Sequence, residues 1–179
     1  MAIKNNSEAI ESNHPDLVAE ESTESKNPDL VTEESTESNP PDLVAECLNY
    51  EILNDARRHY TKDISGKSLC DDVNNSAYKN NWKGRNFYRV MAPAGTKIKE
   101  GCVAGESACG AYGQGYITVG THPTLLNQRA KMKVCFKNGS VCPPSSCRHE
   151  VEIEAINCGS YYVYDLPDLP FCYYAYCTE

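Results

Sequence analysis

Ten cysteines constrain this chain more than any other feature, and all of them lie after residue 46 of 179. An even number of cysteines at irregular spacing within one segment is typical of a disulfide framework formed in an oxidising compartment. We therefore expect five bridges that use all ten: Cys47, Cys70, Cys102, Cys109, Cys135, Cys142, Cys147, Cys158, Cys172 and Cys177. The pairing stays open, since ten cysteines permit roughly nine hundred connectivities.

The first 45 residues differ from the rest in composition. They hold eleven Asp or Glu against two Lys and no aromatic residue, whereas residues 46–179 hold fourteen acids, fifteen bases and all sixteen aromatic residues. Without large apolar side chains the first segment cannot bury enough surface to offset its ordering entropy. We therefore divide the chain into a disordered acidic tail, residues 1–45, and a cysteine-rich domain, residues 46–179.

The acidic tail repeats with a period of thirteen residues. Its three units begin at Asn13, Lys26 and Asn39, and each contains Pro-Asp-Leu-Val. One Leu-Val pair per unit offers too few apolar side chains for a stacked solenoid. We interpret the repeat as an acidic tether duplicated in tandem. The alternative is a repeated docking motif whose avidity rises with copy number.

Charge and hydropathy limit the partners and the location of the protein. The near-neutral residues 46–179 argue against nucleic acid or an anionic membrane surface as a partner. No stretch approaches the roughly 18 uninterrupted apolar residues of a membrane span. The N-terminus M-A-I-K-N-N-S-E-A-I lacks an apolar run long enough for a secretory signal. We expect a fragment or incomplete gene model of a secreted protein; the alternative is an intracellular protein with reduced thiols.

Five short segments are rich in β-branched or aromatic residues and are separated by Gly, Pro and Asn, which predicts strands at 87–91, 116–119, 129–136, 151–156 and 161–166. Residues 129–136 and 151–156 alternate as half-buried strands do. Asn138-Gly139 predicts a tight turn between these two strands, and residues 157–160 predict a second hairpin connection. The expected fold is small, disulfide-rich and mainly β, with short antiparallel strands and long cross-linked loops. Residues 47–60 carry mixed signals and are not assigned.

The order of these features resembles the uromodulin-type eight-cysteine domain family. The resemblance runs from about Cys47 to Cys177 and is carried by Cys70-Asp71, F-Y-R-V at 87–90, Gly95, Cys102, Cys109-Gly110, G-Y-I at 115–117, G-T-H-P at 120–123, Cys135-Phe136, Cys147, Cys158, Y-Y-V-Y at 161–164, Leu166, Pro170, Cys172 and Tyr176-Cys177. Phe87 and Tyr116 stand where the family often has Trp, and both keep an aromatic ring. Ten cysteines exceed the family's eight, which implies that Cys142 and one other form an added bridge. The acidic repeat lies outside the resemblance.

The resemblance implies an extracellular, non-enzymatic module that acts by recognition or by displaying N-glycans for adhesion. Some members have Asn before G-T-H-P, but Val119 stands there in this chain and cannot carry a glycan. Acceptor patterns remain at Asn74 and Asn138, with Asn5 in the tail. Asn138 should lie at the accessible tip of its hairpin, although the turn alone explains Asn-Gly. The alternative function is a passive structural spacer in a matrix or mucus glycoprotein.

Catalytic and metal sites are not predicted, and no cofactor is expected. Cys142, Cys147 and His149 could ligate zinc, but they lack the two short pairs of a structural zinc site. None of the four histidines lies in a recognisable nucleophile motif. We interpret His122 in G-T-H-P as a turn residue hydrogen-bonded to the backbone. The glutamates at 150, 152 and 154 should line one strand face in a row, as at a solvated edge, and do not support a glycosidase pair.

Tyrosines are the better candidates for binding. Alternation along 161–164 should place Tyr162 and Tyr164 on one side and Tyr161 on the other, so about half of the C-terminal rings should be core and half partly exposed. An exposed subset could stack on sugars or contact a cell-surface protein, while packing against disulfides is the default. The six rings concerned are Tyr161, Tyr162, Tyr164, Tyr173, Tyr174 and Tyr176.

Overall fold

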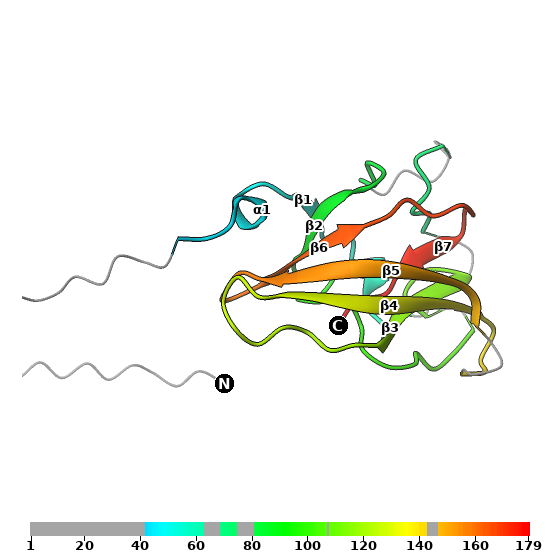
Figure 1. Ribbon diagram of the computed structural model, residues 1–179. Helices are drawn as coiled ribbons and strands as arrows, with labels where there is room; N and C mark the ends of the chain where they lie inside the picture. Colours follow the sequence, from blue (N-terminus) through cyan, green and yellow to red (C-terminus); the bar gives the residue numbers. More distant parts are fainter. Residues whose placement is uncertain (1–41, 63–68, 75–80, 107, 143–146) are drawn as a thin grey trace, which may run out of the picture. The chain divides into compact units, whose positions relative to one another are not determined.

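The computed structural model describes residues 42–62, 69–74, 81–106, 108–142 and 147–179. These residues form a seven-stranded sheet in the order β1-β2-β6-β5-β4-β3-β7 (Figure 1). Helix is limited to α1 (Ala45–Leu48) and the 3-10 helix η1 (Ala56–Arg58) in these ranges. The strands are β1 (Glu51–Leu53), β2 (Asn86–Val90), β3 (Gly113–Val119), β4 (Arg129–Asn138), β5 (Cys147–Asn157), β6 (Tyr162–Leu166) and β7 (Tyr174–Tyr176). The predicted fold class, disulfide-rich and mainly β, is confirmed.

All five predicted strands are present, and two more complete the sheet. The interior pairs are antiparallel, as expected, whereas β1 pairs with β2 and β7 pairs with β3 in parallel. Both added strands have three residues. A segment that short shows no alternation, so local sequence cannot reveal it.

The connection between β4 and β5 corrects one prediction. The expected tight turn at Asn138-Gly139 is wrong, because β4 continues through Asn138, which pairs with Gly113 of β3. Only Gly139 takes a positive φ, 80°, and β4 pairs with β5 as far as Lys137 and Cys147. The predicted connection at 157–160 is confirmed by the pairing of Asn157 with Tyr162.

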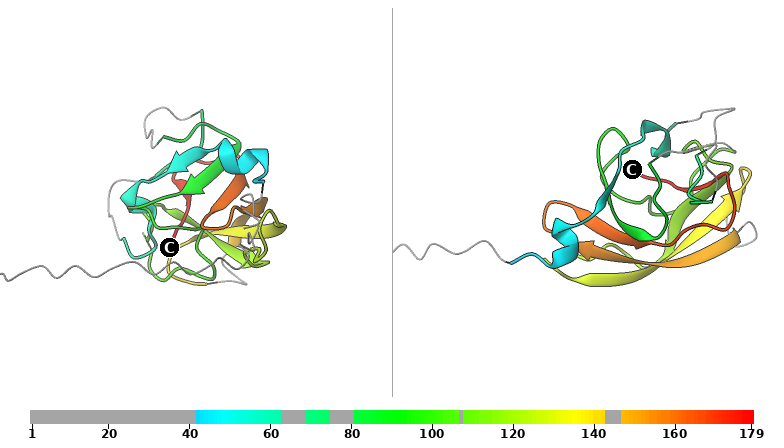
Figure 2. Two further views of the ribbon diagram at one scale, coloured as in Figure 1. Left: turned by 90° about the vertical axis from the view of Figure 1, so that its left-hand side faces the viewer. Right: turned by 90° about the horizontal axis from the view of Figure 1, so that it is seen from above.

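The inner face of the curved sheet holds the main core (Figure 2). Alternation in β4 places Met132, Val134 and Phe136 on this face, as the sequence predicts. Tyr164 and Tyr176 from β6 and β7 are also fully buried there. The C-terminus lies on the inner side of the curve in Figure 2, so the last residues help to fill the core.

The outer face of β4 and β5 carries a ladder of ion pairs. Lys131 Nζ lies 2.9 Å from Glu152, and Lys133 Nζ lies 2.9 Å from Glu150. Arg129 reaches Glu154 at 2.8 Å. The three glutamates thus line one solvated strand face, as predicted, and β5 is paired with β6 only from Glu154 onward.

Each of the ten cysteines takes part in a disulfide. The Cα atoms of the pairs are 4.8 to 5.9 Å apart, within the ordinary range for disulfides. Two of the bridges close loops of more than a hundred residues. The pairs are Cys47–Cys158, Cys70–Cys172, Cys102–Cys142, Cys109–Cys177 and Cys135–Cys147.

The described structure includes residues that the sequence places in the tail. Leu43 and Val44 pack against a small cluster on the outer face, formed by Cys47, Ile156, Cys158 and Val163. The first two repeat units and the acceptor Asn5 lie outside the described residues.

Candidate functional site

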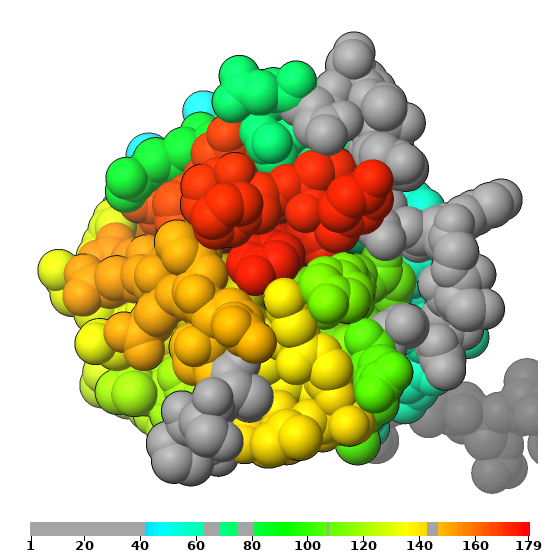
Figure 3. All heavy atoms as spheres, turned by 90° about the vertical axis from the view of Figure 1, so that its right-hand side faces the viewer, coloured from blue at the N-terminus to red at the C-terminus, as the bar shows by residue number. Residues whose placement is uncertain are grey.

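An aromatic stack leads from the core to the surface at one end of the sheet. Phe136 in β4 stacks on Tyr174 of β7 with ring centroids 5.7 Å apart. Tyr174 meets Phe171 edge-on at 5.5 Å, and His149 of β5 packs on Phe171 at 6.0 Å. Figure 3 shows this end, where the C-terminal segment (red) lies beside the ends of β4 and β5 (yellow and orange) and beside β3 (green).

The outer rings of this region are exposed to solvent. Phe171 is 54% exposed, Tyr112 is 58% exposed and Tyr173 is 42% exposed. Tyr173 has a positive φ of 69°, and its carbonyl accepts a hydrogen bond from the Gly113 N–H at 2.8 Å. That bond ties the segment before β7 to the start of β3, next to Tyr112. We call Tyr112, His149, Phe171 and Tyr173 the aromatic face.

The six C-terminal tyrosines divide as predicted. Three are buried and three are partly or largely exposed. Tyr161 packs against the cluster that contains the Cys47–Cys158 disulfide, and its hydroxyl donates a 2.6 Å hydrogen bond to the Cys47 carbonyl. Burial raises the pKa of both Tyr164 and Tyr176 well above its usual value, so these phenols remain protonated.

The two glycan acceptor patterns in the domain differ in accessibility. Asn74 is exposed, and its N–H donates a 2.9 Å hydrogen bond to Asp72. Its partners in the pattern, residues 75 and 76, lie outside the described residues. Asn138 ends β4, and its Oδ1 atom is buried with no hydrogen-bond partner among the described residues. Asn138 is partly exposed at the end of β4 and does not form the tip of a two-residue hairpin.

His122 is held by two side chains rather than by the backbone, so the prediction of its role is wrong. Its Nδ1 atom contacts Glu100 Oε1, and its Nε2 atom lies 2.7 Å from the Tyr164 hydroxyl. The Tyr164 hydroxyl accepts a 3.2 Å hydrogen bond from the Ile98 N–H and can donate its own proton to His122. A neutral imidazole that donates from Nδ1 to an ionised Glu100 satisfies all these contacts.

Burial favours the uncharged forms of both His122 and Tyr164 in this cluster. Burial lowers the pKa of His122, and the neighbouring Glu100 only partly opposes this effect. The hydroxyl at Nε2 belongs to Tyr164, whose high pKa makes it a poor nucleophile. The arrangement orders the segment 98–100 against β6.

A buried ion pair that local sequence does not reveal joins η1 to the C-terminal strand. Arg58 donates from Nη1 and Nη2 to Asp71 at 2.8 and 2.5 Å, and both side chains are fully buried. Asp71 also accepts a 3.0 Å hydrogen bond from the Tyr176 N–H. Burial alone would lower the pKa of Arg58, but Asp71 outweighs burial and raises it. The only local signal is Cys70-Asp71 in the family resemblance.

The zinc alternative loses both of its thiol ligands. Cys142 is bonded to Cys102 and Cys147 is bonded to Cys135, so neither can act as a thiolate. Among the described residues no three His, Cys, Asp or Glu side chains gather as metal ligands would. In the same part of the chain, no helix is long and apolar enough to cross a membrane.

Two comparisons with known proteins bear on this arrangement. The family model of the uromodulin-like eight-cysteine domain matches residues 88–178. The chain is also similar to the pancreatic secretory granule membrane major glycoprotein GP2 of Rattus norvegicus, with 30% identity over 136 residues. The similarity covers 74% of this chain and 23% of that protein, so the chain spans about a quarter of the relative's length.

The disulfides extend the folded module beyond the matched residues. Cys47 and Cys70 precede residue 88, whereas their partners Cys158 and Cys172 lie within the match. Removing the residues before 88 would leave Cys158 and Cys172 without their disulfide partners.

Proposed function

The chain belongs to the uromodulin-like eight-cysteine domain family, and from this premise we propose that it is an extracellular, non-enzymatic glycoprotein module that acts by recognition or by displaying N-glycans. The observation that carries the proposal is the framework of five disulfides in a chain of this family. Bridges at this density persist in oxidising compartments and are rare in the cytosol. The similarity to a glycoprotein supports the same location.

Asn74 is the glycan acceptor that we propose. Its exposed position leaves room for a bulky sugar chain. Asn138 is only partly exposed and its Oδ1 atom is buried, so a glycan on the neighbouring Nδ2 atom would have less room than one on Asn74. A glycan on Asn74 would offer carbohydrate to lectins or to other glycan-binding proteins.

The aromatic face is the second means of recognition that we propose. Exposed Phe and Tyr rings offer large contact areas with few rotatable bonds, and the Tyr hydroxyls can hydrogen-bond to a ligand. Sugars or a cell-surface protein fit such a surface. Phe171 is supported by its contact with Tyr174, which in turn stacks on Phe136 in the core.

The test of glycan display uses the full chain secreted from eukaryotic cells. We expect Asn74→Gln to remove glycan mass and to reduce capture by bacterial surfaces that carry lectins. Asn138→Gln is the matched control and should change neither. An oxidised, glycosylated chain that captures nothing on bacterial surfaces or glycan arrays would instead support the passive spacer.

The test of the aromatic face is separate. Phe171→Ser should weaken direct binding to glycan arrays without altering glycan mass. Leu125→Ser is the control, because Leu125 is 69% exposed and does not belong to the aromatic face. Equal binding by both variants would contradict a binding role for Phe171.

A further inference from the structure

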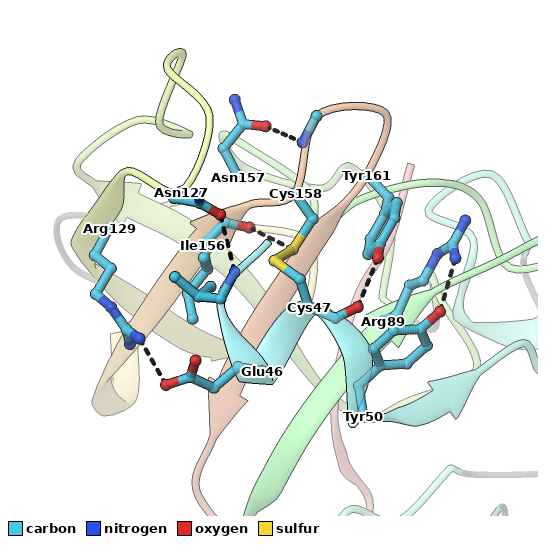
Figure 4. Close-up of a disulfide and its surroundings, with 12 residues drawn as sticks. Glu46, Cys47, Tyr50, Arg89, Asn127, Arg129, Ile156, Asn157, Cys158 and Tyr161 are labelled. Atoms are coloured by element: carbon cyan, nitrogen blue, oxygen red, sulfur yellow. Dashed lines mark hydrogen bonds and ion pairs between the residues drawn. A yellow bond between two sulfur atoms is a disulfide. The ribbon is translucent and has the colours of Figure 1, made fainter. Parts of the chain in front are cut away.

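Residues 42–46, which belong to the third copy of the acidic repeat, pack on the domain. Its shared core is Pro-Asp-Leu-Val-Ala-Glu at 41–46, and the structure describes it from Asp42 onward. Figure 4 shows this segment where it enters α1, beside the Cys47–Cys158 disulfide. We call residues 41–46 the resident unit.

The side-chain amide of Asn127 makes two hydrogen bonds to the backbone of the resident unit. Asn127 Nδ2 donates a 2.9 Å hydrogen bond to the Asp42 carbonyl, and Asn127 Oδ1 accepts a 3.2 Å hydrogen bond from the Val44 N–H. Asn127 is itself fixed, since its N–H donates to the Asn157 carbonyl at 2.7 Å and its φ is 59°. The amide is therefore already oriented for an extended peptide.

Two further contacts involve side chains of the resident unit, one apolar and one charged. Leu43 and Val44 are half-buried against the outer-face cluster that contains Ile156 and Val163. Glu46 meets Arg129 at 2.6 Å (Figure 4), and the ion pair lowers the pKa of Glu46. The site therefore combines two backbone hydrogen bonds, an apolar contact and a positive charge. It suits an acidic peptide with two adjacent aliphatic residues that is extended at the second of them and then enters a helical turn, as Val44, Ala45 and Glu46 do.

The sequence contains this six-residue unit three times. Residues 15–20 read P-D-L-V-A-E, identical to residues 41–46, and residues 28–33 read P-D-L-V-T-E. The one position that varies is Ala45 of the resident unit, which is exposed. Leu43, Val44 and Glu46, which contact the domain, are the same in all copies. The position that varies between copies is therefore one whose side chain is exposed, and the side chains that contact the domain are constant.

We propose that the surface formed by Asn127, Arg129 and the Ile156–Val163 cluster is a recognition site for the P-D-L-V-(A/T)-E unit, and that the units at 15–20 and 28–33 are ligands of the same site. The resident unit is replaceable by either of them. Cys47 anchors the resident unit at its C-terminal end, which keeps its effective concentration at the site high. We therefore expect the other two units to displace the resident unit in only a small fraction of the molecules, unless mutation weakens the binding of the resident unit. This inference is independent of the proposed function, since neither the glycan nor the aromatic face takes part.

The first experiment keeps the full chain and follows the Asn127 side-chain amide by NMR. Leu43→Ser with Val44→Ser weakens only the resident unit, and we expect the amide resonance to stay at its bound position in at least part of the molecules. Adding the same changes at Leu17, Val18, Leu30 and Val31 should abolish the bound signal. Complete loss of the signal in the first variant, equal to the loss in the second, would overturn the proposal.

The second experiment supplies the unit as a free peptide. The synthetic peptide H-P-D-L-V-A-E-E-S, residues 14–22, should restore the bound Asn127 signal in the fully weakened chain, and a scrambled peptide should not. Asn127→Gly keeps the left-handed backbone but removes the amide, so peptide affinity should fall by about tenfold for the loss of two hydrogen bonds. The control is Asn49→Gly at an exposed position outside the site.

Folding of each variant is checked independently by its disulfide map, which should show the five native pairs. In chains with native pairing, equal binding of the scrambled peptide, or unchanged affinity after Asn127→Gly, would overturn the recognition site.

Discussion

At the scale of single residues, the buried pair of Arg58 and Asp71 connects segments that lie far apart in the sequence. A fully buried guanidinium is costly unless a carboxylate meets it with good geometry, and here the two groups make a bidentate contact. The pair holds three separate stretches of chain together: η1, the segment 69–71 and β7.

Arg58→Met should therefore destabilise the domain strongly. It removes the guanidinium from beside a buried Asp71, which should lower the free energy of unfolding by about 3–5 kcal/mol. Arg57→Met is the neighbouring control, since its pair with Asp55 is partly exposed and should be worth about 1 kcal/mol or less. Denaturant unfolding followed by Trp82 fluorescence measures both. A loss no larger than that of the control would contradict the role of the pair.

His122 makes stability depend on pH. Its folded pKa lies below the ordinary 6.5, first because of burial and despite Glu100 and Glu179, while Lys97 adds to the lowering. The unfolded chain therefore binds a proton more readily, so the stabilisation is complete above pH 6.5 and is lost as pH falls.

His122→Gln should flatten this dependence. Denaturant unfolding of the wild type between about pH 7 and pH 5 should show a slope of up to about 1.4 kcal/mol per pH unit from this group. The carboxylates with lowered pKa, among them Glu46, Glu100 and Glu179, titrate below 4.5 and act at lower pH. An unchanged slope in the variant would mean that another group is responsible.

At the scale of elements, β3 depends on glycine for close packing. A Cβ atom on Gly113 would enter the ring of Tyr174, and one on Gly115 would enter the ring of Phe136. These two rings stack on each other across the strand. Glycine is depleted in strands, which explains why the sequence predicts only the second half of this one, 116–119.

Gly115→Ala should lower the free energy of unfolding by about 1–3 kcal/mol, the usual cost of overpacking. Val119→Ala in the same strand is the control, because its side chain is 56% exposed and should matter by less than about 0.5 kcal/mol. Equal stability of the two variants would show that the aromatic rings can move aside.

The disulfide at α1 should matter more than the one within the β4–β5 pair. Cys47 and Cys158 are 111 residues apart in sequence, and Cys135 and Cys147 are 12 apart. Loop entropy predicts a stabilisation of about 4.7 kcal/mol for a loop of a hundred residues and about 3 kcal/mol for a short one. Replacing each pair by serines and measuring unfolding in denaturant tests this order. The reverse order would exclude chain entropy as the main effect.

At the scale of the whole molecule, covalent bridges add to the stability that the packed core provides. Bridges tie the α1 region, the loops before β3 and the C-terminal segment to the sheet. We expect thiol titration of the unfolded, unreduced chain to find no free cysteine. Reduction should lower the melting temperature by tens of degrees or abolish folding, given the loss of several bridges. Two free thiols, or a melting temperature unaffected by reductant, would contradict this framework.

The sequence by itself determined the fold class, the five main strands and the inner and outer faces of β4 and β5. These follow from patterns that are local, such as alternation along a strand and the number of cysteines. It also indicated the family, because many short motifs occur in order.

Tertiary structure alone decided the cysteine pairing, the two parallel edge strands and the seating of residues 42–46. It also decided that His122 contacts Glu100 and Tyr164 and that Arg58 is buried beside Asp71. Each of these joins segments far apart in the chain. A local pattern carries no information about which distant group supplies the partner of a hydrogen bond, a charge or a thiol, so only the folded arrangement could show it.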